Sequence, residues 1–443
     1  MKRRVDKVTF PGRGTTSFNF TSPIITENKQ RQRIEGSVRP IGGVAGDGPY
    51  EFIVPESATT FLHLNSIVLY GKFKILKANG TEDTVDTDVV APINNFGIGL
   101  WDTTEVSLND NIINGQSSPH SNYKGHLETI LSYDDSIKDA HLPCQFYFPD
   151  TAGRFNAKEI TGMTCNAGFK TRREITKLSK VFETMSPVTS DFLRCMNHLA
   201  PGNKLSIKLY RAKDQFVLLS KTTNDVTPEY RLKILDLKLY FNRIRVTDGY
   251  RLSSIERYPI ETTELIMRPL CSGLLEAHLD IQSSGRIPKM VVVAQVLTEA
   301  TNGNFSENPF YFRHFSLTSI SLRVNDRNIP NEPLKTDFES ANVSRSCRAF
   351  HHLFMNTGSW RVNKGTCIGP NSFMNGNTVF PFDLSPDLCN GHHLHESETG
   401  SLSLDLSWKT ALTHPVTILI YRSYNDILRK TEEDPSKFEI DPI

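Results

Sequence analysis

The sequence lacks four features that identify common classes of protein. Its seven cysteines are widely spaced and form no CxxC pair, so a disulfide scaffold is not expected and reduced thiols in an intracellular protein fit better. No apolar run approaches the roughly 18–20 residues of a membrane-spanning helix, and no apolar core follows the basic N-terminus as in a secretory signal. The 50 basic and 49 acidic residues nearly cancel, so net charge indicates no partner.

Known catalytic motifs are also missing. The sequence has no HExxH, GxSxG, GxxxxGK[ST] or EF-hand pattern. The glycine-rich run at 42–48 precedes no helix pattern, so we interpret it as a hinge and not as a phosphate loop. We interpret Asp134-Asp135 as the end of a helix and not as a catalytic carboxylate pair. His351-His352 is assigned to a helix face with apolar neighbours.

One loop offers ligands for a metal ion. Cys389, His392, His393 and His395 lie within seven residues and could hold zinc or copper. Ligands this close together rarely complete a tetrahedral site, and no second Cys/His pair lies near them. We therefore prefer a histidine-rich surface loop, and we predict no catalytic, cofactor-binding or metal-binding residue and no cofactor.

What the sequence does contain is a repeated unit of strand, turn and helix. Val106 and Leu108 alternate with polar residues up to Asn109-Asp110, and a helix pattern over 121–131 follows, with Ser121 as its expected cap. The same order recurs after Asn308: an alternating strand ends at Asn325-Asp326, and apolar residues return at near-helical spacing over 343–354. The Asn-Asp pairs begin at 109 and 325, 216 residues apart, which indicates two domains of one kind and not a solenoid.

Other strand patterns support the duplication. Leu205, Ile207 and Leu209 alternate in LSIKL, and the matching piece LSLDL begins at Leu402. Long irregular segments, 134–190 and 356–400, lie at matching places in the two halves. The fold class we predict is all-β, with two tandem β-sandwich domains of the jelly-roll kind and short helices in loops.

The composition suggests where the domains begin and end. The predicted organisation is listed in chain order: a flexible basic arm over 1–48, a first jelly-roll domain over 49–247, a linker over 248–258, a second jelly-roll domain over 259–430 and a C-terminal tail over 431–443. Nine basic and three acidic residues lie in 1–39. Lys2, Arg3 and Arg4 could contact nucleic acid or direct nuclear import, and the alternative is that the arm ties neighbouring subunits together.

The order of these features resembles one known family. Its elements are PINNF from Pro92, the strand VSLNDNIING, the helix YKGHLETIL and a last strand that runs into Tyr424-Asn425-Asp426-Ile427-Leu428-Arg429. This order resembles the double jelly-roll major capsid proteins of the adenovirus and tailless-phage lineage, and it is closest to those of Polinton-like and related small animal DNA viruses. The resemblance extends over most of 50–429.

The resemblance implies a structural function without catalysis. It implies a homotrimer of six sandwiches, a pseudo-hexamer that tiles an icosahedral capsid around a DNA genome. The expected partners are further copies of the chain, penton and minor capsid proteins, and nucleic acid through the arm. The expected location is the virion, assembled inside the host cell, with the nucleus as one candidate site.

Three alternatives remain open from the sequence. A penton or minor capsid protein is one, although such proteins usually carry a single jelly roll. A two-domain jelly-roll metalloenzyme that uses the Cys389–His395 loop is another. A carbohydrate-binding module is the third. Clustered aromatic residues would support it, but the three tryptophans of this chain, at 101, 360 and 408, are scattered.

Overall fold

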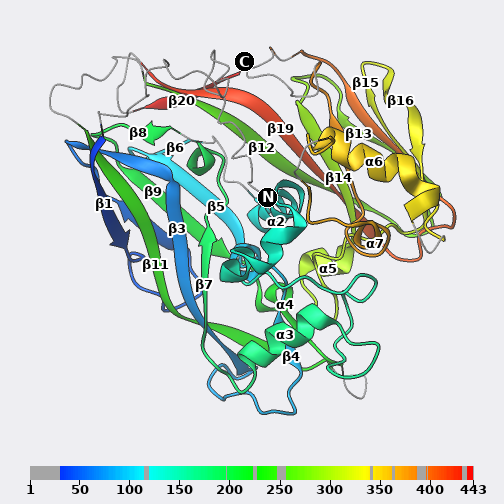
Figure 1. Ribbon diagram of the computed structural model, residues 1–443, viewed down its shortest axis with the longest axis horizontal. Coiled ribbons are helices and arrows are strands. Elements are labelled where there is room, and N and C mark those ends of the chain that lie inside the picture. Colours follow the sequence, from blue (N-terminus) through cyan, green and yellow to red (C-terminus); the bar gives the residue numbers. More distant parts are fainter. Residues whose placement is uncertain are drawn as a thin grey trace, which may run out of the picture.

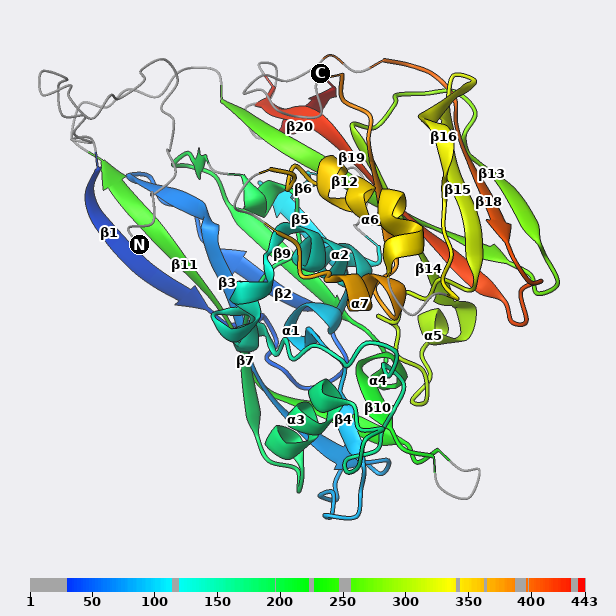
Figure 2. The ribbon, with the colours of Figure 1, turned by 45° about the vertical axis from the view of Figure 1, so that its right-hand side comes forward.

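Two β-sandwiches lie side by side in the molecule (Figure 1). The computed structural model describes residues 30–113, 119–195, 197–222, 227–246, 256–339, 343–361, 365–386, 396, 398–431 and 437–442. Figure 2 shows the same two sandwiches after a 45° turn, the first coloured blue to green and the second green to red. No helix within these ranges is long and apolar enough to cross a membrane.

The first sandwich is built from eight main strands in two antiparallel sheets. One sheet has the order β1-β11-β3-β7 and the other the order β2-β9-β5-β6. The strands are β1 (Gln30–Val38), β2 (Tyr50–Val54), β3 (Thr60–Lys77), β5 (Trp101–Leu108), β6 (Asn111–Ile112), β7 (Phe182–Pro187), β9 (Leu205–Arg211) and β11 (Tyr230–Val246).

The second sandwich repeats this plan strand for strand. Its sheets have the orders β12-β19-β14-β17 and β13-β18-β15-β16. The strands are β12 (Arg257–Leu270), β13 (Glu276–Gln282), β14 (Met290–Leu297), β15 (Leu317–Val324), β16 (Arg327–Lys335), β17 (Val379–Asp383), β18 (Leu402–Trp408) and β19 (Val416–Lys430). The two orders coincide when strands are matched by their sequence in each half. The predicted fold, two tandem jelly rolls, is therefore confirmed.

Shorter strands, helices and 3₁₀ turns complete the two sandwiches. The additional strands are β4 (Val90–Pro92), β8 (His198–Leu199), β10 (Leu218–Ser220) and β20 (Phe438–Pro442). The helices are α1 (Phe96–Gly99), α2 (Ser121–Ser132), α3 (Ala167–Thr176), α4 (Asp214–Val217), α5 (Thr298–Asn302), α6 (Cys347–Asn356) and α7 (Pro370–Met374). The 3₁₀ turns are η1 (Asp135–Asp139), η2 (Leu142–Gln145), η3 (Phe192–Arg194) and η4 (Val343–Ser346).

The repeated Asn-Asp pairs form the same hairpin turn in both sandwiches. Asn109 and Asp110 have φ angles of 50° and 68°, and Asn325 and Asp326 have φ angles of 45° and 66°. Two successive left-handed residues are the geometry of a two-residue type I′ hairpin, in which asparagine and aspartate are favoured. These turns join β5 to β6 and β15 to β16. The sequence predicted the turns at which β5 and β15 end, but it did not predict the partner strands β6 and β16.

The alternating leucines form the interior of each sandwich. Leu205 and Ile207 of β9 have no exposed surface, and Leu402, Leu404 and Leu406 of β18 are at most 1 % exposed. Burial of each such side chain stabilises the fold by about 1.5–3 kcal/mol relative to exposure. The matching LSIKL and LSLDL pieces therefore occupy equivalent central strands of the two sandwiches.

The predicted flexible arm over 1–48 is wrong for residues 30–38. These residues form β1, which pairs with β11 along the edge of the first sandwich. The strand looks polar in sequence because one of its faces is exposed, while Ile34, Gly36 and Val38 alternate on the other and are half-buried. Gly36 has no side chain because the ring of Phe241 occupies that space.

Other boundaries also differ from those predicted. β12 begins at Arg257, inside the segment predicted as a linker over 248–258. Residues 438–442, predicted as part of a tail, form β20 and pair with β19. The segments predicted as irregular, 134–190 and 356–400, contain α3, β7, α7 and β17. Pro381 in the middle of β17 hid that strand, because proline is unusual inside a sheet.

Candidate functional site at the junction of the two sandwiches

Helix α2 lies between the two sandwiches in both views (Figures 1 and 2). Its apolar residues Tyr123, Leu127 and Ile130, each 1 % exposed, recur at the spacing that predicted the helix. Ser121 was expected to cap the helix but is its first residue, and His120 precedes it in a left-handed conformation without a side-chain cap. Burial on nearly every side replaces capping as the source of stability.

Aromatic rings connect α2 to the second sandwich. The ring of His126 stacks on Phe310 with centroids 3.9 Å apart, and the ring of Tyr123 meets Phe310 edge to face at 5.6 Å. Burial lowers the pKa of His126 to about 3, so its imidazole is neutral near pH 7. Asn95 Nδ2 lies 3.4 Å from His126 Nδ1 and can donate to it in that neutral form.

A buried ion pair forms a second connection. Lys124 Nζ of α2 lies 2.7 Å from Asp191 Oδ1, and their side chains are 1 % and 2 % exposed. The same carboxylate accepts hydrogen bonds from Thr263 N at 2.9 Å and Thr263 Oγ1 at 2.8 Å, which places β12 of the second sandwich on the pair. A buried charge pair is tolerated because additional hydrogen bonds satisfy the carboxylate.

Glu128 extends this polar network. Its carboxylate accepts a hydrogen bond from the Tyr421 hydroxyl of β19 at 3.2 Å. It also forms an ion pair with Arg194 at 2.8 Å. Burial raises the pKa of Glu128, and the charges of Arg194 and Lys124 oppose that rise. α2 is thus joined to both β12 and β19 of the second sandwich.

A separate cluster of residues outside α2 also joins the sandwiches. Arg172 of α3 has no exposed side-chain surface and binds Asp150 at 2.6 Å. Asp150 also accepts a hydrogen bond from Asn308 Nδ2 at 2.9 Å, and Asn308 belongs to the second sandwich, in the segment between α5 and β15. Nearby, Phe155 stacks on Tyr311 at 4.8 Å. Two polar clusters and two ring stacks therefore fix one sandwich against the other.

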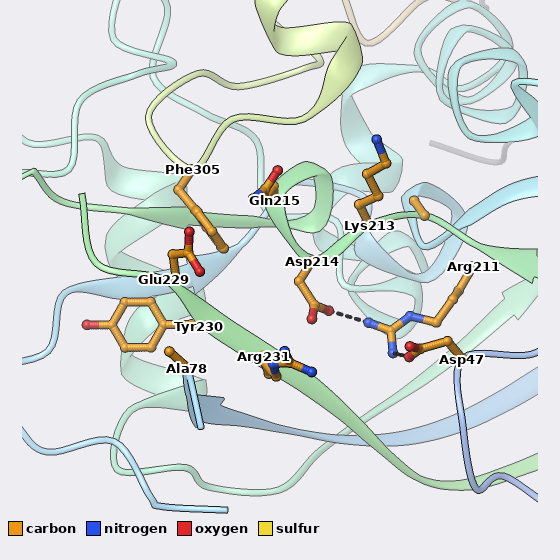
Figure 3. A pocket seen from close by; sticks show the side chains of 11 residues that line it. Asp47, Ala78, Arg211, Lys213, Asp214, Gln215, Glu229, Tyr230, Arg231 and Phe305 are labelled. Carbon is orange, nitrogen blue, oxygen red and sulfur yellow. Dashed lines mark hydrogen bonds and ion pairs between the residues drawn. The ribbon is translucent and has the colours of Figure 1, made fainter. Parts of the chain in front are cut away.

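A hollow beside α4 is a candidate ligand site (Figure 3). Its cavity of about 540 Å³ is lined by Arg211, Asp214 and Tyr230 of the first sandwich and by Phe305 of the second. Arg211 binds both Asp47, at 2.9 Å, and Asp214, so its charge is already matched by two carboxylates. The guanidinium is therefore unsuited to hold a phosphate, and we assign no catalysis to this cavity.

The structure places most of the residues singled out in the sequence in ordinary structural roles. Gly42 and Gly43 have φ angles of 79° and 80° in the turn after β1. Asp134 caps η1 by accepting a hydrogen bond from Ser136 N at 2.9 Å. His352 lies against Phe382, and burial lowers the pKa of this histidine to about 4. The ring of His351 meets the ring of Trp360 edge to face.

Two candidate segments lie outside the described residues: Lys2, Arg3 and Arg4 of the arm, and the Cys389–His395 loop. Within the described ranges, no three or more His, Cys, Asp or Glu residues are grouped to hold a metal ion. Sequence reasoning missed Lys124, Asp191 and Thr263. The only signal was a lysine placed between Tyr123 and Leu127 on the apolar side of a helix.

Comparisons with known proteins agree with this architecture. No family model matches the chain. An uncharacterized protein of Caenorhabditis elegans, F54H12.2, is 25 % identical over 357 residues, which is 77 % of this chain and 81 % of that protein.

Solved structures from virus particles share the fold. A chain of the Sputnik virophage superposes with a TM-score of 0.65 at 10 % identity and covers 98 % of this chain and 93 % of that one. The mavirus major capsid protein gives 0.56 at 10 % identity, with 97 % and 95 % covered. The VP54 protein of PBCV-1 gives 0.54 at 10 % identity, with 96 % and 100 % covered. The chain therefore has the double jelly-roll fold found in viral capsid proteins.

Proposed function

We propose that the chain is a major capsid protein, whose trimers are pseudo-hexagonal blocks of an icosahedral shell around a DNA genome. The observation that carries the proposal is that one chain holds two sandwiches with the same strand order, side by side. Three copies then present six similar sandwiches around a three-fold axis. A nearly hexagonal block of this kind can tile a closed shell.

The junction supports this proposal because a tile must keep its outline. The hydrogen bonds from Thr263 to Asp191 and from Asn308 to Asp150 cross the junction, as does the stack of His126 on Phe310. These contacts oppose rotation of one sandwich against the other. The formal net charge of +1 allows many copies to pack laterally without strong repulsion. The three solved structures named above, each with a TM-score above 0.5, come from virus particles or capsid proteins.

The finer parts of the proposal concern location and partners. The protein belongs in the virion after assembly inside the host cell, with the nucleus as the proposed site. Its partners are further copies in the lattice, penton proteins and minor capsid proteins. Lys2, Arg3 and Arg4 supply the proposed contact with nucleic acid, where each neutralised phosphate makes binding more sensitive to salt.

The function we propose is not enzymatic. The metalloenzyme alternative depends entirely on the Cys389–His395 loop, and metal analysis of the purified protein tests it directly. A penton or minor capsid protein is less well supported, because a duplicated sandwich suits a tile that approximates six-fold symmetry from three copies.

Negative-stain electron microscopy of the purified protein tests the proposed function. We expect particles with a hexagonal outline and three-fold symmetry, or closed shells built from them. Two-lobed particles without three-fold symmetry would contradict the proposal.

A further inference from the structure

Equivalent sheets of the two sandwiches differ in how they are covered. In the second sandwich, Tyr421 of β19 points toward α2 and donates to Glu128. The residues that share its side of the strand are Thr417, Leu419 and Ser423, and they are 3 %, 0 % and 0 % exposed. Helix α2 of the first sandwich therefore takes part in covering the outer face of the sheet β12-β19-β14-β17.

The matching sheet of the first sandwich, β1-β11-β3-β7, lacks such a cover in the part of the chain that the structure describes. Its outward side chains include Val68, Tyr70, Met185, Pro187 and Tyr240, which we call the open sheet face. Tyr70 lies opposite Met185 and Val68 opposite Pro187 in the strand register. Met185 is 40 % exposed, and the Tyr70 and Tyr240 rings meet edge to face at 6.4 Å.

The composition of this face suits a protein contact. Tyrosine and methionine are enriched in interfaces, and their apolar bodies lie here on the solvent side of a sheet. Ion pairs border them: Lys72 binds Glu183 at 2.9 Å, and Lys238 binds Asp236 at 3.5 Å. An apolar centre with a charged border is the usual anatomy of an interface.

Helix α6 occupies the same place in the chain order as α2. α2 follows the β5-β6 hairpin and precedes β7 in the chain. In the same way, α6 follows the β15-β16 hairpin and precedes β17. α6 buries Ala349 and Leu353 against its own sandwich. Its other side carries Arg348, His351 and Met355 at helical spacing, together with Trp360. Trp360 is 44 % exposed, and its ring centroid lies 4.2 Å from that of His351.

We propose that the α6 face, formed by Arg348, His351, Met355 and Trp360, covers the open sheet face of the next copy of this chain. Within one chain, α2 of the first sandwich covers a sheet of the second sandwich. In the proposed contact, α6 of the second sandwich covers the equivalent sheet of the first sandwich in the next chain. Figure 1 shows the elements that carry the two faces at opposite sides of the molecule, β1, β11 and β3 at the left and α6 at the right. Such a head-to-tail contact produces a closed ring of three chains when each sandwich is rotated by one sixth of a turn relative to the one before it.

This inference rests on the proposed trimer, and two variants test it separately. Met185→Glu places a charge in the apolar centre of the open sheet face, and Trp360→Glu places a charge in the α6 face. Both positions are exposed, so each variant should fold with an unchanged circular dichroism spectrum. The matched control is Leu275→Glu, at a residue that is 51 % exposed and belongs to neither face.

Light scattering gives the readout. The wild type and the Leu275→Glu control should have a mass of about 150 kDa, and each interface variant should have the 50 kDa mass of a monomer. An equal mixture of the two variants retains one intact contact and should form a heterodimer of about 100 kDa that cannot close.

The contradicting results are separable. Trimers that persist in either variant, or a mixture that stays monomeric, would overturn the inference and leave the trimer proposal intact. A monomeric wild type would overturn the proposed function itself.

Discussion

The ring of His126 lies flat on the ring of Phe310, with centroids 3.9 Å apart and ring planes 2° from parallel. The two residues belong to different sandwiches and are 184 positions apart in the chain. His126 is carried by α2, and Phe310 lies in the segment before β15. This contact and the nearby ion pairs hold the two sandwiches together at the junction. A rigid two-sandwich tile depends on them.

Removal of one partner from the buried ion pair should be strongly destabilising. Asp191→Asn removes the hydrogen-bonded counter-charge of the buried Lys124 ammonium group, a loss that typically costs about 3–5 kcal/mol of the free energy of unfolding. Urea denaturation measures the change. Lys409→Met, which breaks the exposed pair with Glu339, is the control and should cost less than about 1 kcal/mol. Equal losses in the two variants would contradict this account of the junction.

Acid should weaken the fold through His126. Burial lowers the pKa of this histidine from 6.5 to about 3, so between these values the unfolded chain binds a proton that the folded chain does not. The free energy of unfolding therefore falls as the pH drops below 6.5. His126→Phe keeps a ring on Phe310 and should make that fall smaller by about 1.4 kcal/mol per pH unit between about pH 6 and pH 4.

Urea denaturation of both proteins over this pH series checks the prediction. His314 and His352, whose pKa values burial lowers to about 4, are present in both proteins and contribute equally. An identical pH dependence in the wild type and the variant would show that His126 does not contribute.

Gly168 should not tolerate a side chain. A Cβ atom at this position of α3 would lie 2.3 Å from the carbonyl oxygen of Pro149 and 2.6 Å from that of Phe148. Backbone atoms cannot rotate away, so Gly168→Ala should cost about 1–3 kcal/mol of stability. The matched control is Gly369→Ala, where a Cβ would meet nothing within 4 Å. Thermal unfolding distinguishes them, and equal midpoints would refute the prediction.

The Asn-Asp turn should accept glycine at its second position. Asp326 has a φ angle of 66°, which costs energy for a residue with a side chain. Asp326→Gly creates the Asn-Gly pair favoured in type I′ turns and should stabilise the fold by about 0.5–1 kcal/mol. Asp326→Val should destabilise it, because a β-branched residue is strained at positive φ. Chemical denaturation of the two variants should show shifts of opposite sign.

The fold was predictable where the signal was local. Alternation in LSIKL and LSLDL, the two Asn-Asp turns and the spacing of Tyr123, Leu127 and Ile130 each indicated an element that the structure contains. β1 was missed because this edge strand exposes one face and only half-buries the other, so its sequence shows few apolar residues. β17 was missed because Pro381 lies inside it.

The junction was not predictable in the same way. Lys124 and Asp191 are 67 residues apart, and Thr263 lies 72 residues beyond Asp191. Lys124 and Asp191 meet through the tertiary fold of the first sandwich, and Thr263 reaches Asp191 only because the two sandwiches pack together. No short-range periodicity records either contact. The same limit applies to the open sheet face, whose residues come from β3, β7 and β11.

The solution mass of the purified protein tests the central claim most directly. A subunit of a pseudo-hexagonal tile should scatter light as a trimer of about 150 kDa, three times the 50.0 kDa chain, or as larger shells. A clean monomer of 50 kDa across the accessible range of protein concentration would contradict the capsid proposal.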